Sequence, residues 1–210
     1  MDILNQLSSR KGDKTEDSNK IVAEKCIANP RLLAEIADGL VETQCLASLR
    51  SDCIEVFTLV AEKKPELIVP YAENVIPLLH SKETKTRWEA VHTLSFIAAN
   101  IPDVIFSMLP TLQSLIEKDK STIVRDYAMD TVANYAKVSA ETSAQSYEIL
   151  KFALELWSEK HAKQVLRGFN YVLDNYTDCK AEIHSLVQPY LSANKKIVAT
   201  EATKIVKRIE

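Results

Sequence analysis

The sequence predicts an all-α protein in which about five helical hairpins stack into a right-handed superhelix. Segments beginning at Arg50, Arg87 and Arg125 carry the same apolar pattern at spacings of 37 and 38 residues. Self-similarity at such a period is typical of stacked helix pairs. Only 3 of the 210 residues are glycine, which leaves few of the turns that all-β folds and nucleotide-binding loops require.

The amino-terminal part is predicted to be separate from the repeats. Residues 1–17 are expected to form a short helix or linker, because the stretch from Ser8 to Asp17 is too polar to bury. A first repeat helix is expected from about Ser18 to Ala28. Residues 18–210 are then predicted to form a single repeat domain, since such an array grows by stacking and need not split.

The first helix of each hairpin is expected to begin at a proline. Pro30, Pro65 and Pro102 each open a Pro-x-apolar-apolar sequence, 35 and 37 residues apart. Proline at the first helical position costs nothing, because its missing N–H would have no partner there. Matching apolar residues downstream predict a buried stripe; they are Ile36, Tyr71 and Met108, followed by Leu40, Val75 and Leu112.

The second helix of each hairpin begins at the arginine. Counted from it, apolar residues stand at the third, seventh, tenth and eleventh positions, within about 60° of one direction on a helix. These predicted core residues are Cys53, Ala90, Ala128; Phe57, Leu94, Val132; Val60, Ile97, Tyr135; and Ala61, Ala98, Ala136. The fifth position points the opposite way and is predicted to be exposed.

The repeat loosens after about residue 138. A long helix is expected from Ala144 to Lys160. The last helix recovers the apolar pattern with Ala202, Val206 and Ile209, two periods beyond the helix that begins at Arg125. The carboxyl-terminal part is therefore expected to continue the array.

The chain resembles the HEAT-repeat family of armadillo-like superhelices. The run Val124, Arg125, Ala128 and Val132 carries the resemblance, and its copies extend it over about residues 30–138. In that family an aspartate between the two helices pairs with the arginine, and in this chain Asp119 lies six residues before Arg125. The resemblance therefore implies a structural role for Asp119.

The resemblance also implies structural bonding between repeats for Arg50, Arg87 and Arg125. The aspartate is missing from two of the three repeats, because Gln44 and Ser81 stand six residues before Arg50 and Arg87. Those two arginines are expected to find other acids or carbonyl groups, since a cation at a helix start is otherwise unfavourable.

The polar side of the arginine-led helices supplies the candidate binding residues. By the resemblance this helix lines the concave side, where acids recur in one register. The candidate partner-binding residues are Asp52, Glu55, Trp88, Glu89, His92, Asp126 and Asp130. The acids predict a groove for a basic peptide or protein surface, with Trp88 as an apolar anchor. The alternative is a solvated helix face, where carboxylates near the helix start are favoured by the helix dipole.

The sequence contains no pattern typical of catalysis, metal binding or cofactor binding. The four histidines, His80, His92, His161 and His184, have no second histidine at helical spacing, and the four cysteines, Cys26, Cys45, Cys53 and Cys179, form no CxxC pair. The protein is therefore predicted to be no enzyme and to need no metal or cofactor.

The favoured function is a non-catalytic protein-interaction scaffold. The alternative is a HEAT-like DNA alkylation-repair glycosylase, in which Trp88, Asp126 and Asp130 would act. Two features argue against the glycosylase. The predicted groove is acidic, whereas a groove that binds DNA must be cationic. His92 also occupies the position where the motif of that family has an acid. HEAT-like lyases that attach bilin chromophores share the fold but have no residue signature here.

The charge and hydropathy of the chain predict where the protein is located and which class of partner it binds. The formal net charge of −3 gives no global attraction to nucleic acid, and no apolar stretch of 18 residues predicts a membrane span. The amino terminus shows no secretory signal. We expect a cytoplasmic protein that binds another protein.

Overall fold

The computed structural model describes residues 2–41 and 46–210. Every regular element among these residues is a helix, so the predicted all-α fold of stacked helices is confirmed. The chain divides into two compact units, Met1–Asn100 and Ile101–Glu210. We describe each unit by itself. Gln44 and Cys45 lie outside the described residues.

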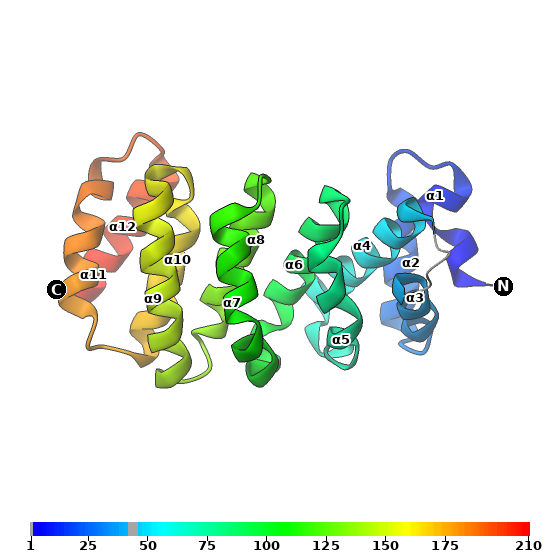
Figure 1. The fold of residues 1–210 in the computed structure, drawn as a ribbon, viewed down its shortest axis with the longest axis horizontal. Coiled ribbons are helices and arrows are strands. Elements are labelled where there is room, and N and C mark those ends of the chain that lie inside the picture. Colours follow the sequence, from blue (N-terminus) through cyan, green and yellow to red (C-terminus); the bar gives the residue numbers. More distant parts are fainter. Residues whose placement is uncertain (1, 42–45) are drawn as a thin grey trace. The chain divides into compact units, whose positions relative to one another are not determined.

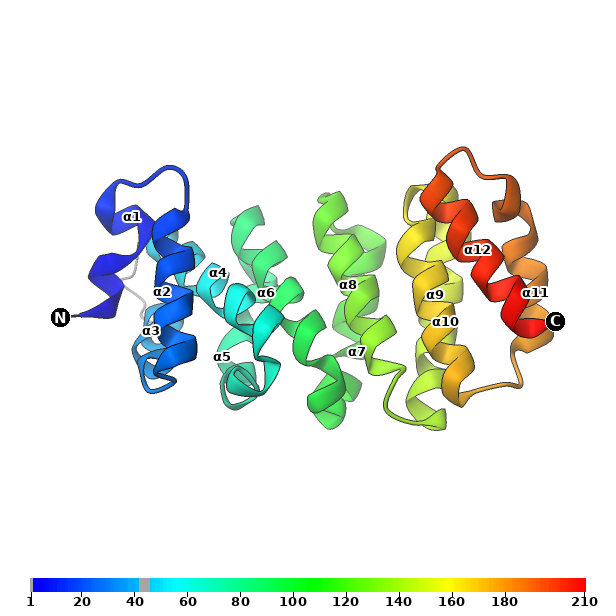
Figure 2. The same ribbon diagram turned by 180° about the vertical axis from the view of Figure 1, so that it is seen from behind.

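The first unit, unit 1, stacks three long helices side by side. Its α-helices are α1 (Ser8–Lys11), α2 (Asp17–Ala28), α3 (Leu32–Val41), α4 (Ala47–Lys63), α5 (Ala72–Val75) and α6 (Thr84–Ile97). Helix α4 packs against both α2 and α6, and these three form one layer, while α3 and α5 lie in the other (Figures 1 and 2). Five 3-10 helices join them: η1 (Ile3–Gln6), η2 (Pro65–Leu67), η3 (Val69–Tyr71), η4 (Ile76–His80) and η5 (Ala98–Asn100).

The second unit, unit 2, repeats this two-layer arrangement. Its α-helices are α7 (Pro102–Lys118), α8 (Thr122–Tyr135), α9 (Ala140–Trp157), α10 (Ala162–Asn175), α11 (Lys180–Val187) and α12 (Lys196–Ile209), with 3-10 helices η6 (Ser158–Lys160) and η7 (Gln188–Ser192). Helix α10 packs against α8 and α12, in front in Figure 2, while α9 and α11 lie in front in Figure 1. We call the layer of α2, α4 and α6, and that of α8, α10 and α12, the inner layer of each unit.

One predicted proline-led helix is broken into short pieces. Pro102 opens the continuous helix α7, as predicted, but the segment from Pro65 forms η2, η3, α5 and η4 in turn. Pro70 and Pro77 lie within η3 and η4. Each removes a backbone donor, and its ring crowds the preceding turn, which favours a break in the helix. Helix α7 stays continuous with one internal proline, Pro110, whereas the broken segment contains two after Pro65.

The amino-terminal segment packs against the repeats more closely than its polarity predicts. Ile3 and Leu7 are 2% and 0% exposed, and Ser8 is buried with them. The expectation that the polar stretch would stay unburied is therefore wrong for Ser8. Ile3 and Leu7 pack against the first repeat helices, and Ser8 is buried because it is adjacent to Leu7.

The predicted core positions of the arginine-led helices are confirmed. All twelve of them, from Cys53 to Ala136, are buried. The register at the carboxyl terminus is different, because Val198, Ala202 and Ile205 are buried in α12 whereas Val206 and Ile209 are half-exposed. Of the three residues of the last helix that were predicted to match core positions of the repeat, only Ala202 is therefore buried.

Two glycines let helices approach closely. A Cβ atom at Gly39 of α3 would stand 2.6 Å from Sγ of Cys53 on α4, and one at Gly168 of α10 would stand 2.6 Å from a methyl carbon of Leu150 on α9. Real Cβ atoms do not approach so closely, so either substitution would require the neighbouring side chain to shift.

Leu94 tests the packing of the repeat. It is completely buried on α6, so Leu94→Ala should lower the free energy of unfolding by about 2 to 5 kcal/mol, the usual cost of a new cavity. Leu156→Ala on α9 is the matched control, because Leu156 is 44% exposed. Urea unfolding followed by circular dichroism measures both; equal small losses would contradict the burial.

Candidate functional site

The predicted partner-binding acids of unit 1 are buried. Asp52, Glu55 and Glu89 are 6%, 8% and 7% exposed. The prediction that the fifth position faces solvent is therefore wrong for Glu55. The reason is lateral packing: α4 has a neighbour on each side, α2 and α6, so positions away from the apolar stripe are covered as well.

A single asparagine joins two of these acids. Asn19 of α2 donates from Nδ2 to Oδ1 of Asp52 at 3.0 Å and to Oε2 of Glu55 at 3.1 Å. The amino-terminal segment completes the cluster, because the Ser9 amide donates to Oδ2 of Asp52 at 2.7 Å and the Ser8 amide donates to Oδ1 of Asn19 at 2.9 Å. These neutral donors satisfy buried oxygens, as buried polar groups require. They leave the charge of the carboxylates uncancelled.

Lys85 of α6 brings a positive charge to this cluster. Its ammonium group lies 2.8 Å from Oε2 of Glu55 and also bonds Glu16. Burial raises the pKa of Glu55, against the opposing effect of Lys85. Burial alone would lower the pKa of Lys85, but the two carboxylates outweigh it and raise that pKa.

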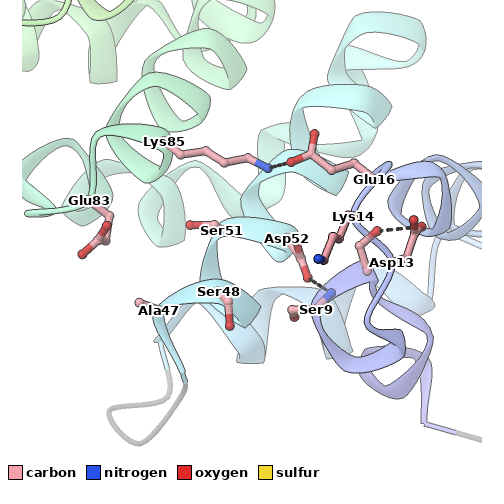
Figure 3. Close-up of a pocket in the computed structure, with 11 residues that line it drawn as sticks. Ser9, Asp13, Lys14, Glu16, Ala47, Ser48, Ser51, Asp52, Glu83 and Lys85 are labelled. Atoms are coloured by element: carbon pink, nitrogen blue, oxygen red, sulfur yellow. Dashed lines mark hydrogen bonds and ion pairs between the residues drawn. The ribbon is translucent and has the colours of Figure 1, made fainter.

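A pocket of about 440 Å³ opens beside the cluster (Figure 3). It lies between the amino-terminal segment, the first turns of α4 and the start of α6. Its lining residues are Ser8, Ser9, Asp13, Lys14, Glu16, Ala47, Ser48, Ser51, Asp52, Glu83 and Lys85. Four carboxylates and two ammonium groups are among them, so the pocket is acidic. Its volume is in the range of sites that hold small ligands or side chains.

Hydroxyl groups hold α4 to α6 beside the pocket. Oγ of Ser51 and Oγ1 of Thr86 are 2.8 Å apart, and the hydroxyls of Thr58 and Thr93 are 2.9 Å apart. Glu89 is buried near this row, and burial raises its pKa. Small hydroxyl residues satisfy each other here without adding charge.

Trp88, His92 and Phe96 lie one turn apart along α6 and are all half-buried. The rings of His92 and Phe96 have centroids 4.8 Å apart. The buried Nε1 of Trp88 has no hydrogen-bond partner within the part of the chain that the structure describes. This aromatic stripe, which we define as these three residues, makes the exposed side of α6 partly apolar.

In unit 2, Asp126 is held by a histidine. Nδ1 of His161 lies 2.6 Å from Oδ1 of Asp126, while Nε of Arg125 donates to Nε2 of His161 at 3.1 Å. The guanidinium of Arg125 lies 4.1 Å above the ring of Trp157. Since an arginine nitrogen can only donate, Nε2 of His161 must accept, and the proton of this neutral imidazole lies on Nδ1.

The arginines of the repeat bond to main-chain carbonyls. Nη1 of Arg125 donates to the carbonyl of Asp119 at 2.6 Å, and Nη1 of Arg87 donates to the carbonyls of Ser81 and Lys82 at 2.8 and 3.1 Å. The side chain of Asp119 accepts a bond from the Ser121 amide at 2.8 Å.

Asp130 and Arg50 complete the set of predicted site residues. Asp130 is paired with Arg167 of α10, and burial raises the pKa of Asp130. Arg50 is half-buried near the start of α4. The binding and structural roles assigned to these residues from the sequence remain predictions.

Sequence reasoning missed the partners of the acids. Asn19, Ser9 and Lys85 lie 33, 43 and 30 residues from the carboxylates that they meet. His161 has no second histidine at helical spacing, yet it bonds Asp126, which is 35 residues away. The one available signal is spacing, since two of these four separations, 33 and 35 residues, are close to one repeat.

Over residues 2–41 and 46–210, no group of three or more histidine, cysteine, aspartate or glutamate side chains could hold a metal ion. Cys26, Cys53 and Cys179 are buried. No described helix is both long enough and apolar enough to cross a membrane.

Comparison with known proteins places the fold among engineered helical repeats. No protein-family model matches the chain, and no curated protein matches it in sequence. A designed armadillo repeat protein in complex with the peptide (KR)4 has 16% identity and a TM-score of 0.74, over 99% of this chain and 98% of that one.

Two further solved structures are also similar to this chain. Computationally designed armadillo repeat proteins for modular peptide recognition have 17% identity and a TM-score of 0.71, over 98% of this chain and 97% of that one. An engineered protein has 18% identity and a TM-score of 0.75, over 100% and 99%. The fold is an armadillo-like helical repeat. The more specific HEAT assignment remains a prediction.

His92 predicts a pH dependence of stability. Burial lowers its pKa from 6.5 to about 4, so between these pH values the unfolded chain binds a proton that the folded chain does not. Acidification through this range should therefore favour unfolding. His92→Phe keeps a ring beside Phe96 and cannot bind the proton, so it should lose less stability between pH 7 and pH 4 than the unchanged chain.

The measurement is urea unfolding at pH 7, 6, 5 and 4. His80→Phe is the control, since it removes a histidine from an exposed place in the same unit. Equal losses for the unchanged chain and His92→Phe would refute the assignment.

Proposed function

We propose that this chain is a non-catalytic interaction scaffold that binds a basic segment of a partner protein on the inner layer of its repeats. The observation that carries the proposal is the excess of carboxylates around the pocket of unit 1. Asp52 is satisfied there by neutral donors, from Ser9 and Asn19. A cationic partner would cancel a charge that these amides cannot.

The comparisons support the same class of partner. One similar structure is a designed armadillo repeat protein with a bound (KR)4 peptide, and another was designed for modular peptide recognition. At 16% and 17% identity these proteins share the fold. The basic partner is inferred from the charge of the present chain.

Trp88 is proposed as the apolar anchor of the interface. It lies on α6 three residues after Lys85, and its side chain is half-buried. Tryptophan combines a large apolar area with one donor, which is why it is frequent at binding hot spots. Glu89 and His92 flank it, while Asp126 and Asp130 are proposed for the inner layer of unit 2. We further propose that the scaffold acts in the cytoplasm.

Rim charges and the anchor should affect binding kinetics differently. Glu83 lines the pocket, Glu62 lies in the last turn of α4 on the same layer, and both are exposed. Glu62→Lys with Glu83→Lys should therefore slow association with a labelled (KR)4 peptide about tenfold and weaken its salt dependence. Trp88→Ala should instead speed dissociation by about 30-fold, corresponding to roughly 2 kcal/mol. Surface plasmon resonance measures both rates.

The double change Glu148→Lys with Glu155→Lys is the control, because it alters the net charge equally on exposed positions of α9. If this control slows association as much as the rim variant, or if folded Trp88→Ala binds unchanged, the proposed surface is wrong.

The absence of catalysis can be tested against the glycosylase alternative. We expect no release of bases from alkylated duplex DNA, because the pocket carboxylates would repel its phosphates. The assay compares the unchanged chain with Trp88→Ala and with a no-protein blank. Base release well above both would overturn the scaffold proposal.

A further inference from the structure

Lys85 is placed against the ordinary preference of a helix. It is the second residue of α6, where the helix dipole disfavours a positive charge. It also reaches across to Glu55 of α4, and to Glu16 of the amino-terminal segment (Figure 3). A residue that violates a local rule and is compensated by long-range contacts indicates a functional constraint.

The carboxylates around Lys85 differ in exposure. The side chain of Glu55 is 10% exposed and that of Glu16 is 48% exposed. One carboxylate is therefore fixed in the unit and the other stands at the pocket rim. Glu16 is held there in a left-handed backbone conformation, with φ of 63°, which is uncommon for a residue other than glycine.

The Lys85 side chain itself is 32% exposed. It extends along the pocket wall, and its stem is partly open to solvent. An ammonium group on a flexible stem that is partly solvated can leave the exposed Glu16 at small cost, because exposed ion pairs contribute little. It can leave the buried Glu55 at small cost only where another cation takes its place, because an unpaired buried charge is unfavourable. The buried carboxylate of Glu55 cannot leave.

We propose that Lys85 is a tethered cation that occupies the place of a lysine or arginine side chain of the partner, and that binding of the partner displaces it from Glu55 and Glu16. This inference rests on the proposed function and makes it more specific. The pocket is the entry, since Asp13, Asp52 and Glu83 line it together with Lys85 and Glu16.

The chemistry of the pocket favours a cationic side chain over other occupants. An anion would face four carboxylates, and no group of residues suited to a metal ion lies among the described residues. A guanidinium or ammonium group meets Glu55 with the geometry that Lys85 already shows, at 2.8 Å. Charge-assisted bonds of this kind are the strong ones.

The experiment measures the affinity of the full chain for a fluorescent (KR)4 peptide by anisotropy. Lys85→Met removes the ammonium group and keeps an unbranched side chain, so it should bind the peptide about tenfold more tightly than the unchanged chain. Lys85→Arg keeps a tethered cation and should stay within about twofold of the unchanged chain.

Lys63→Met is the matched control. Lys63 pairs with Glu24 in the same unit, with both side chains more than half exposed, and its replacement changes the net charge by the same amount. It should have little effect on affinity. Circular dichroism shows whether each variant is folded, and Lys85→Gln replaces Lys85→Met if the latter is not.

The outcomes separate this inference from the proposed function. If the unchanged chain binds (KR)4 and Lys85→Met binds no more tightly than Lys63→Met, the tethered cation is refuted while the scaffold proposal stands. If neither the unchanged chain nor folded Lys85→Met binds (KR)4, both fail. Tighter binding by Lys85→Met alone supports both.

Discussion

Lateral packing of helices within the inner layers is the constraint on which the other features depend. A helix at the surface of an ordinary globular protein buries one stripe and leaves the opposite side to solvent. In unit 1, α4 packs against α3 beneath it and against α2 and α6 at its sides. Asp52 and Glu55 stand outside the apolar stripe, yet they are 6% and 8% exposed.

Polar residues in such a layer must find partners on the next helix. In unit 1, small neutral groups act as these hydrogen-bond partners, as in the pair Thr58 and Thr93 and in the bonds that Asn19 donates. Neutral donors avoid the large desolvation cost of a second buried charge. They leave the carboxylate charge uncancelled, and the resulting negative field is the physical basis of the proposed preference for a cationic partner.

The sequence predicts local features well and pair contacts poorly. The core positions from Cys53 to Ala136 follow from the helical period, which is a property of each helix alone. The break after Pro65 is not predicted; Pro70 and Pro77 give it a local cause, but α7 accommodates Pro110 within a continuous helix, so an internal proline alone does not predict a break. Burial of Glu55 depends on the distance between neighbouring helices, which no single-helix pattern contains.

The two units pair a carboxylate with different partners. In unit 2, Asp126 meets the imidazole of His161, which is fully buried and fixed from its other side by Arg125. The side chain of His161 is 0% exposed and Arg125 is buried, so both partners of this carboxylate are enclosed, although the Asp126 side chain itself is 27% exposed. In unit 1, Glu55 meets an ammonium group whose stem is partly solvated. A counter-charge can be exchanged only where it has a path to solvent, and the side chain of Lys85 is 32% exposed whereas that of His161 is 0% exposed. This difference is the reason that the proposed exchange is placed at Lys85 and not in unit 2.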